Sequence, residues 1–95
     1  MARQALAIAR DNPEVLRVAG FALAAFAGES ETALTAINRA IELNPNYAFA
    51  YAQRGIVLAY LNRPDEAIIA AERAIRLSPN DPTVLSRRRE LNSYR

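Results

Sequence analysis

The sequence predicts an all-α protein built from pairs of helices that recur about every 34 residues. Three observations predict this fold class. Alanine, the strongest helix former, supplies 20 of the 95 residues, whereas glycine supplies three. Apolar residues recur at steps of three and four along the chain, which is the spacing of one helix face. Residues 39–45 (RAIELNP) return 34 positions later as residues 73–79 (RAIRLSP).

Short breakers divide the chain into successive helical stretches. A glycine interrupts it at position 28, and prolines interrupt it at positions 13, 45, 64 and 79. Five helices are therefore expected, followed by a terminal helical segment. Their expected bounds are residues 2–10, 13–27, 30–43, 47–61, 64 or 65 to 77, and 82–94.

The residues at the predicted helix starts suit those positions. Asn12, Asn46 and Asp81 each stand where a side-chain oxygen can accept from the free amides of the following turn. Pro13 and Pro82 fit the first helical position, where no amide hydrogen is needed. These residues support the proposed helix boundaries.

Two pairs of acidic residues also lie at predicted helix starts: Glu29 with Glu31, and Asp65 with Glu66. Paired carboxylates can act as a general acid and base. The positive end of the helix dipole also favours negative charge in the first turn. The second explanation accounts for both pairs, so neither is interpreted as catalytic.

The composition excludes most enzyme chemistry. The chain has no histidine, cysteine, lysine or tryptophan. It therefore lacks thiolate and imidazole metal ligands, cysteine nucleophiles, serine–histidine dyads and Schiff-base lysines. We expect no enzymatic activity, no metal and no cofactor.

The charge pattern favours neither nucleic acid nor membrane as a partner. Twelve basic and ten acidic residues are interspersed, giving a net charge of +2, without the concentrated positive field of a nucleic-acid binder. The run Arg87–Arg89 beside Glu90 is expected to be a solvated helix face. No apolar run approaches the ~20 residues of a membrane span, and residues 1–4 show no signal-peptide core. A soluble, cytoplasmic protein is expected.

The repeat places small residues at matching positions in two units. Gly20 and Gly55 are 35 residues apart, so the first unit holds one extra residue, assigned to the turn at 28–30. An alanine-rich bundle would not need the same small residues and the same proline at this spacing. The matching positions of the second unit are Tyr51, Gly55, Leu58, Ala67, Ala74 and Pro79, and those of the first are Leu16, Gly20, Leu23, Ala33, Ala40 and Pro45.

This pattern resembles the tetratricopeptide repeat, a 34-residue helix pair. Arg54, Ala71 and the longer turn at 27–30 depart from it without changing the architecture. The resemblance implies a right-handed α-α superhelix of about two and a half units. It also implies a fragment of a longer protein, and the richness in alanine and arginine without lysine suggests a bacterial one. The implied parts are the second helix of a truncated preceding unit (1–12), two full units (13–46 and 47–80) and a polar capping helix (81–95).

The resemblance also implies a ligand groove lined by the first helix of each unit. Apolar and aromatic residues follow one another along this face, and an arginine lies near each end. The aromatic residues can alternatively pack against neighbouring helices, and the sequence leaves both possibilities open. The expected groove residues are Arg17, Val18, Phe21, Phe49, Gln53, Ile56, Tyr60 and Arg87.

Some members of this family grip the terminal carboxylate of a peptide with basic and amide side chains. Arg17, Gln53 and Arg87 fall at positions of that clamp. Phe21 replaces an essential asparagine, and Thr83 replaces a lysine, so the clamp is incomplete. A more apolar peptide or helix is expected in the groove.

The resemblance therefore implies a non-catalytic module that binds another protein or a peptide. Such a module would serve as a regulatory or scaffolding arm of a larger protein. The alternative is self-association, in which a homodimer forms through the apolar N-terminal end or the groove, with no separate ligand.

Overall fold

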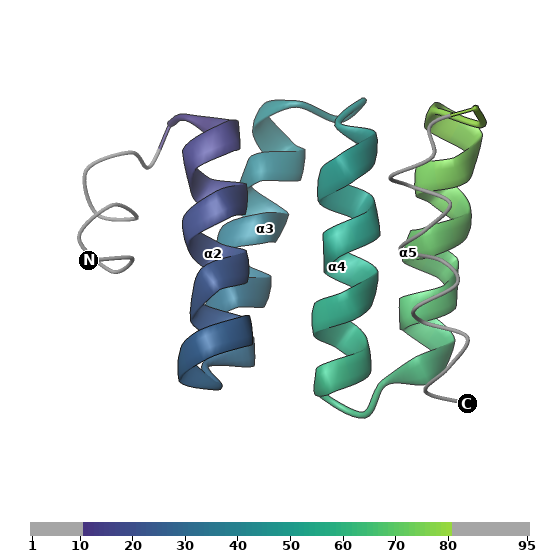
Figure 1. Ribbon diagram of the computed structural model, residues 1–95. Coiled ribbons are helices and arrows are strands. Elements are labelled where there is room, and N and C mark those ends of the chain that lie inside the picture. Colours follow the sequence, from purple (N-terminus) through teal and green to yellow (C-terminus); the bar gives the residue numbers. More distant parts are fainter. Residues whose placement is uncertain (1–10, 81–95) are drawn as a thin grey trace.

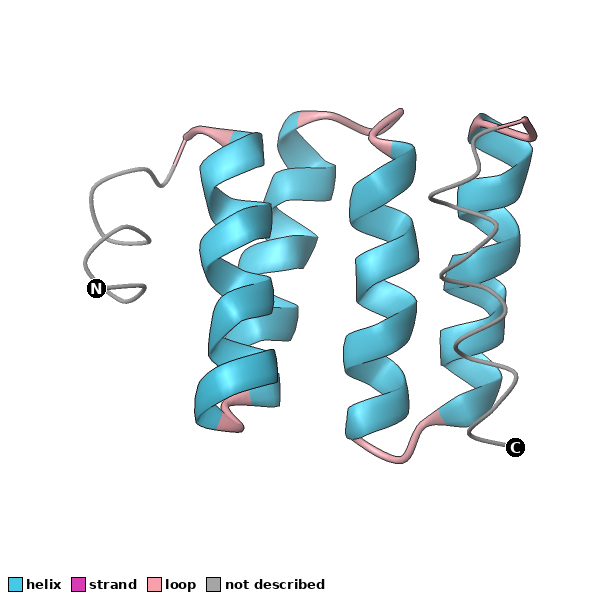
Figure 2. Cartoon of the chain, viewed as in Figure 1, coloured by secondary structure: helices cyan, strands magenta, loops and turns pink. Residues whose placement is uncertain are grey.

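A computed structural model describes residues 11–80, and within this range the chain is helical without strands (Figures 1 and 2). The expected helices at 2–10 and 82–94, the cap at Asp81 and the groove residue Arg87 lie outside the described residues. The four helices are α2 (Pro13–Ala27), α3 (Ser30–Leu43), α4 (Ala48–Tyr60) and α5 (Pro64–Leu77). Their predicted bounds are confirmed, except that α4 is one residue shorter at each end.

The helices form two pairs. Helix α2 packs against α3, and α4 packs against α5, while α4 also contacts α3 and α2. Figure 1 shows α2 and α4 side by side, with α3 behind α2 and α5 beyond α4. This arrangement confirms the all-α class built from stacked helix pairs, and it brings the first helices of the two pairs together.

Local chemistry explains where α2 begins and ends. The Asn12 side chain accepts a hydrogen bond from the Val15 amide at 3.2 Å, and Pro13 occupies the first turn. At the other end Gly28 adopts φ +69°, and its amide donates to the Leu23 carbonyl. A residue with a Cβ is disfavoured in this left-handed conformation, so glycine suits the end of the helix. Both sequence predictions are confirmed.

The predicted cap at Asn46 is wrong. Tyr47 occupies the N-cap position of α4, and no side-chain capping bond forms there. The Tyr47 carbonyl accepts from the amides of Ala50 and Tyr51 instead. The Asn46 amide donates to the Asn44 side chain at 3.3 Å, within the preceding turn. Asn46 therefore lies one residue too early for its side chain to cap the helix.

Small residues allow the paired helices to cross closely. Ala33, Ala40, Ala67 and Ala74 are at most 1% exposed. A Cβ added to Gly20 would lie 3.0 Å from the Ala36 Cβ and 3.4 Å from the Ala33 carbonyl oxygen. The larger core side chains, among them Ile37, Ile56 and Leu58, are fully buried in one cluster.

Replacing Gly20 with valine tests this close approach. The added methyl groups must displace α3, and such overpacking destabilises a protein by about 1–3 kcal/mol. We therefore expect the free energy of unfolding of Gly20→Val to fall by this amount in urea denaturation followed by circular dichroism. Ala25→Val, at an exposed position of the same helix, is the control and should shift it by less than about 0.5 kcal/mol. Equal effects of the two changes would contradict the role assigned to Gly20.

Candidate functional site

Arg17 of α2 reaches across to the beginning of α4 and contacts three of its side chains. Its Nε donates to the Tyr47 hydroxyl at 2.5 Å, and its Nη1 donates to Gln53 Oε1 at 3.0 Å. Its guanidinium carbon lies 4.6 Å from the centre of the Phe49 ring and 5.5 Å from that of Tyr47. We call Arg17, Tyr47, Phe49 and Gln53 the Arg17 cluster.

The elements that carry this cluster explain its geometry. Phe49 and Gln53 are four residues apart on α4 and therefore share one face of that helix. The contact between α2 and α4 places Arg17 opposite this face, although 36 residues separate Arg17 from Gln53. The cluster thus joins the first helices of the two pairs.

Gln53 makes the cluster structurally important. Its side chain is only 4% exposed, although it is polar. A buried amide without a partner is destabilising, and the bond from Arg17 satisfies its oxygen. The same bond holds the guanidinium group in place over the Phe49 ring, where the cation–π attraction adds to its stability.

This arrangement presents a positioned arginine beside aromatic rings. Arg17 is partly buried, and its Nη2 takes part in neither of the two hydrogen bonds described above. A guanidinium group fixed in this way can donate to a carbonyl or carboxylate oxygen of a ligand. The rings of Tyr47 and Phe49 offer apolar contact area next to it.

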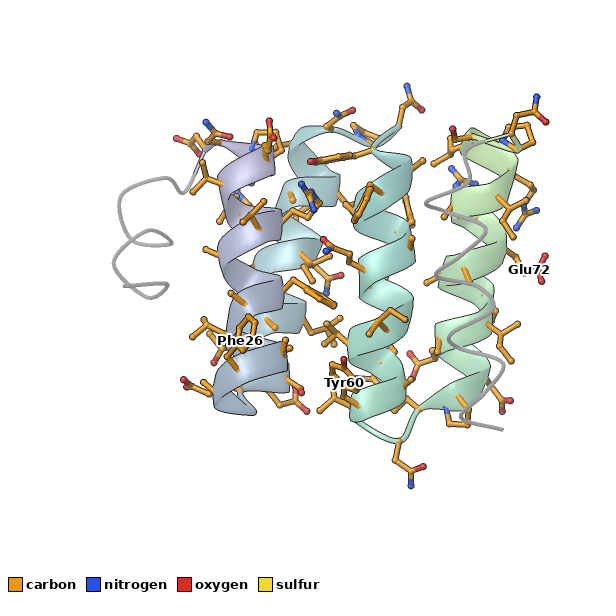
Figure 3. The ribbon with its side chains drawn as sticks, in the orientation of Figure 1. Phe26, Tyr60 and Glu72 are labelled. Carbon is orange, nitrogen blue, oxygen red and sulfur yellow. The ribbon has the colours of Figure 1, made fainter. Side chains whose placement is uncertain are left out.

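The structure places the other predicted groove residues at different depths. Phe21 is half-buried against the core, and Tyr60, labelled near the end of α4 in Figure 3, is 41% exposed. Ile56 is fully buried in the core and is therefore inaccessible at the surface. Of the two aromatic residues, Phe21 packs against the core, as the internal-packing possibility has it, whereas Tyr60 is accessible.

Val18 lies apart from the Arg17 cluster. It is 51% exposed and borders a shallow cavity of about 350 Å³ on α2. The residues that line this cavity are Asn12, Glu14, Val15, Val18, Ala19 and Ala22. No residue of the Arg17 cluster is among them, so Val18 and Arg17 belong to different surfaces of the same helix.

Tyr47 is the member of the Arg17 cluster that sequence reasoning missed. Helical spacing identifies residues that share a face within a helix, whereas Tyr47 precedes α4 at its N-cap. The sequence does place Tyr47 two residues before Phe49 and six before Gln53, at the start of the predicted groove helix. Its contact with Arg17 depends on how the two helix pairs stack.

Two other features are absent from residues 11–80. No helix in this range is both long and apolar enough to span a bilayer. The same residues contain no group of three or more acidic side chains placed to hold a metal ion.

Comparison with known proteins identifies the repeat. Residues 48–81 match the family model of the tetratricopeptide repeat. The crystal structure of MamA protein is similar over 98% of this chain, with a TM-score of 0.75 and 26% sequence identity. The chain spans 56% of the length of that MamA chain. Together these findings show a tetratricopeptide repeat at residues 48–81, within an all-helical fold similar to that of MamA protein.

A double-mutant cycle tests the bond between Arg17 and Gln53. Arg17→Ala leaves the Gln53 oxygen buried without its donor, so we expect the free energy of unfolding to fall by about 2 kcal/mol. In the Gln53→Leu background the same change should be less costly, by about 1 kcal/mol, because no unsatisfied amide remains. Urea denaturation of the four proteins measures the coupling. Additive effects within about 0.3 kcal/mol would show that the two side chains do not stabilise each other.

Proposed function

We propose that this tetratricopeptide-repeat chain is a non-catalytic module that binds a peptide or helix of a partner protein along the face shared by α2 and α4. We further propose that it serves as a regulatory or scaffolding arm of a larger cytoplasmic, bacterial protein. Tetratricopeptide repeats generally mediate protein–protein interaction, which supports this class of function. The observation that carries the proposal is the Arg17 cluster.

The cluster combines the two features that peptide recognition needs. Arg17 supplies a hydrogen-bond donor whose position is set by Gln53 and Tyr47. Phe49 lies beside it, and Phe21 and Tyr60 extend the aromatic character along the same two helices. A ligand can place apolar side chains on the rings and a carbonyl or carboxylate oxygen near the guanidinium group.

The contacts within the cluster favour an apolar ligand over a free terminal carboxylate. Arg17 and Gln53 stand at two positions of the carboxylate clamp, yet they bond to each other. Phe21 stands where the clamp has an asparagine, so that position offers a ring in place of an amide. Specificity would then come chiefly from the aromatic surface, with Arg17 orienting the ligand.

Self-association is the second candidate, and a separate observation favours it. Phe26, labelled on α2 in Figure 3, is 91% exposed, and Val18 on the same helix is 51% exposed. Val18 lines the 350 Å³ cavity described above, and Phe26 lies eight residues further along the same helix. Exposed apolar side chains on one helix are suited to contact with a second copy of the chain.

Replacement of groove aromatics by glutamate tests the first candidate. We expect the wild-type chain to retain a specific protein from a lysate, and Phe21→Glu/Tyr60→Glu to lose it, because charge replaces the apolar contact surface. Mass spectrometry identifies the retained protein, and circular dichroism checks that each variant folds. Because Phe21 is half-buried, the single change Tyr60→Glu provides a test that spares the core.

Ser30→Glu/Thr35→Glu is the control, since it adds the same charge on α3. Retention of the same protein by the folded Tyr60→Glu and Phe21→Glu/Tyr60→Glu variants would count against the groove as the binding surface.

Sedimentation equilibrium tests the second candidate. If α2 mediates a homodimer, the wild-type chain should show a concentration-dependent mass above the 10.5 kDa monomer. Val18→Ser/Phe26→Ser should lower the dimer population at least about tenfold, since it removes the exposed apolar contacts. A wild-type chain that stays monomeric at every concentration would exclude self-association as its function.

A further inference from the structure

A second cavity, of about 420 Å³, lies between α4 and α5, away from the Arg17 cluster. Tyr51 and Arg54 of α4 line it, together with Ile69, Arg73 and Arg76 of α5. No residue of the Arg17 cluster is among its lining residues. The proposed groove function therefore does not account for this surface.

The cavity gathers three arginines. Arg73 and Arg76 are exposed, and the Arg73 guanidinium carbon lies 5.8 Å from the centre of the Tyr51 ring. Arg54 is partly buried, and its Nε is a buried donor without a hydrogen-bond partner. An unsatisfied buried donor is destabilising, so a rotation of the Arg54 side chain that brings Nε to an acceptor of a ligand would be favourable.

Of residues 11–80, Glu66 is the one acidic residue that lines the cavity, and its carboxylate is already engaged by Arg63. Glu66 accepts two hydrogen bonds from Arg63, at 2.5 Å from Nε and 2.8 Å from Nη2. These bonds from Arg63, with the nearby Arg63 and Arg54 charges, lower the pKa of Glu66. Glu72, labelled on α5 in Figure 3, is not among the residues that line the cavity. Among residues 11–80, no carboxylate forms an ion pair with Arg54, Arg73 or Arg76.

The equivalent arginine of the first repeat is paired with carboxylates. Arg39 occupies on α3 the position that Arg73 occupies on α5, 34 residues later. Arg39 donates to Asp11, which precedes its unit, at 3.1 Å and to Glu42 of its own helix at 3.3 Å, so two carboxylates neutralise it. Its charge is therefore satisfied within the chain.

The equivalent positions around Arg73 carry neither of these carboxylates. The position of Glu42 is taken by Arg76, and that of Asp11, by the 35-residue offset, is taken by Asn46. One carboxylate becomes an arginine and the other a neutral amide. The two units share one backbone arrangement, but the two carboxylates that balance the charge of Arg39 have no counterpart at the equivalent positions around Arg73.

We propose that the cavity between α4 and α5 is a second docking site, which binds an acidic segment of a protein partner. Arginine holds carboxylates through paired hydrogen bonds, and three guanidinium groups line this cavity. Ile69, which is 66% exposed, and the ring of Tyr51 receive an apolar side chain of the same segment. The aliphatic contact at Ile69 beside the charges favours a peptide, because nucleic-acid binding rests on phosphate contacts and on stacking of bases against aromatic rings.

Fluorescence anisotropy with the full chain tests this site. The probe is a fluorescein-labelled peptide, Glu-Glu-Leu-Glu-Glu, and the neutral control is Gln-Gln-Leu-Gln-Gln. We expect the acidic peptide to bind and the neutral one to bind at least about tenfold more weakly, because the arginines recognise carboxylates.

The repeat offers a matched pair of variants. Arg73→Glu should weaken binding of the acidic peptide at least about tenfold, while Arg39→Glu, the equivalent change in the first unit, should leave it within about twofold. Circular dichroism confirms that both variants fold. Phe21→Glu/Tyr60→Glu should bind the acidic peptide as the wild type does, which separates this site from the proposed groove.

Three results would overturn the proposal. The first is equal binding of the acidic and neutral peptides. The second is equal loss of affinity in the Arg73→Glu and Arg39→Glu variants. The third is tighter binding of oligothymidylate than of the acidic peptide, with Arg73→Glu weakening it, which would assign the surface to nucleic acid.

Discussion

The close crossing of helices within each pair is the constraint on which the rest of the structure depends. Gly20 lies so near α3 that an added Cβ would meet Ala36 at 3.0 Å, and buried alanines line the crossings. Because the two helices of each pair lie close together, the second pair can stack on the first with α4 in contact with both α2 and α3. This stacking brings α2 and α4 side by side and so creates the surface that carries the Arg17 cluster.

The Arg17 cluster is both a structural link and a candidate binding surface. Small apolar side chains make most of the core, and they pack without strong directional preference. The bond from Arg17 to the buried Gln53 is directional, so it helps to define how α2 sits against α4. A ligand that contacts Arg17 would therefore meet a side chain whose orientation the fold has already set, with little ordering to be lost on binding.

The two units show how one backbone carries different surface chemistry. Arg39 is neutralised by Asp11 and Glu42, whereas Arg73 lines a cavity with Arg76 and forms no ion pair with another of residues 11–80. Side chains on the outer faces of the helices are free to vary because they do not determine the crossing. In a repeat protein, comparison of equivalent positions thus separates residues that maintain the stack from residues available for recognition.

The sequence by itself determined the helices, their order and the repeat, because these depend on local chemistry. Apolar spacing, the Asn12 cap and the glycine at position 28 act within a few residues, and matching small residues reveal the crossings. The cap predicted at Asn46 failed because a shift of one residue in the helix start puts its side chain out of reach. Only the tertiary structure decided that Ile56 is buried, that Tyr47 meets Arg17 and that Arg54 lines a cavity. These outcomes depend on the distance and rotation between helices, which the spacing along one helix does not specify.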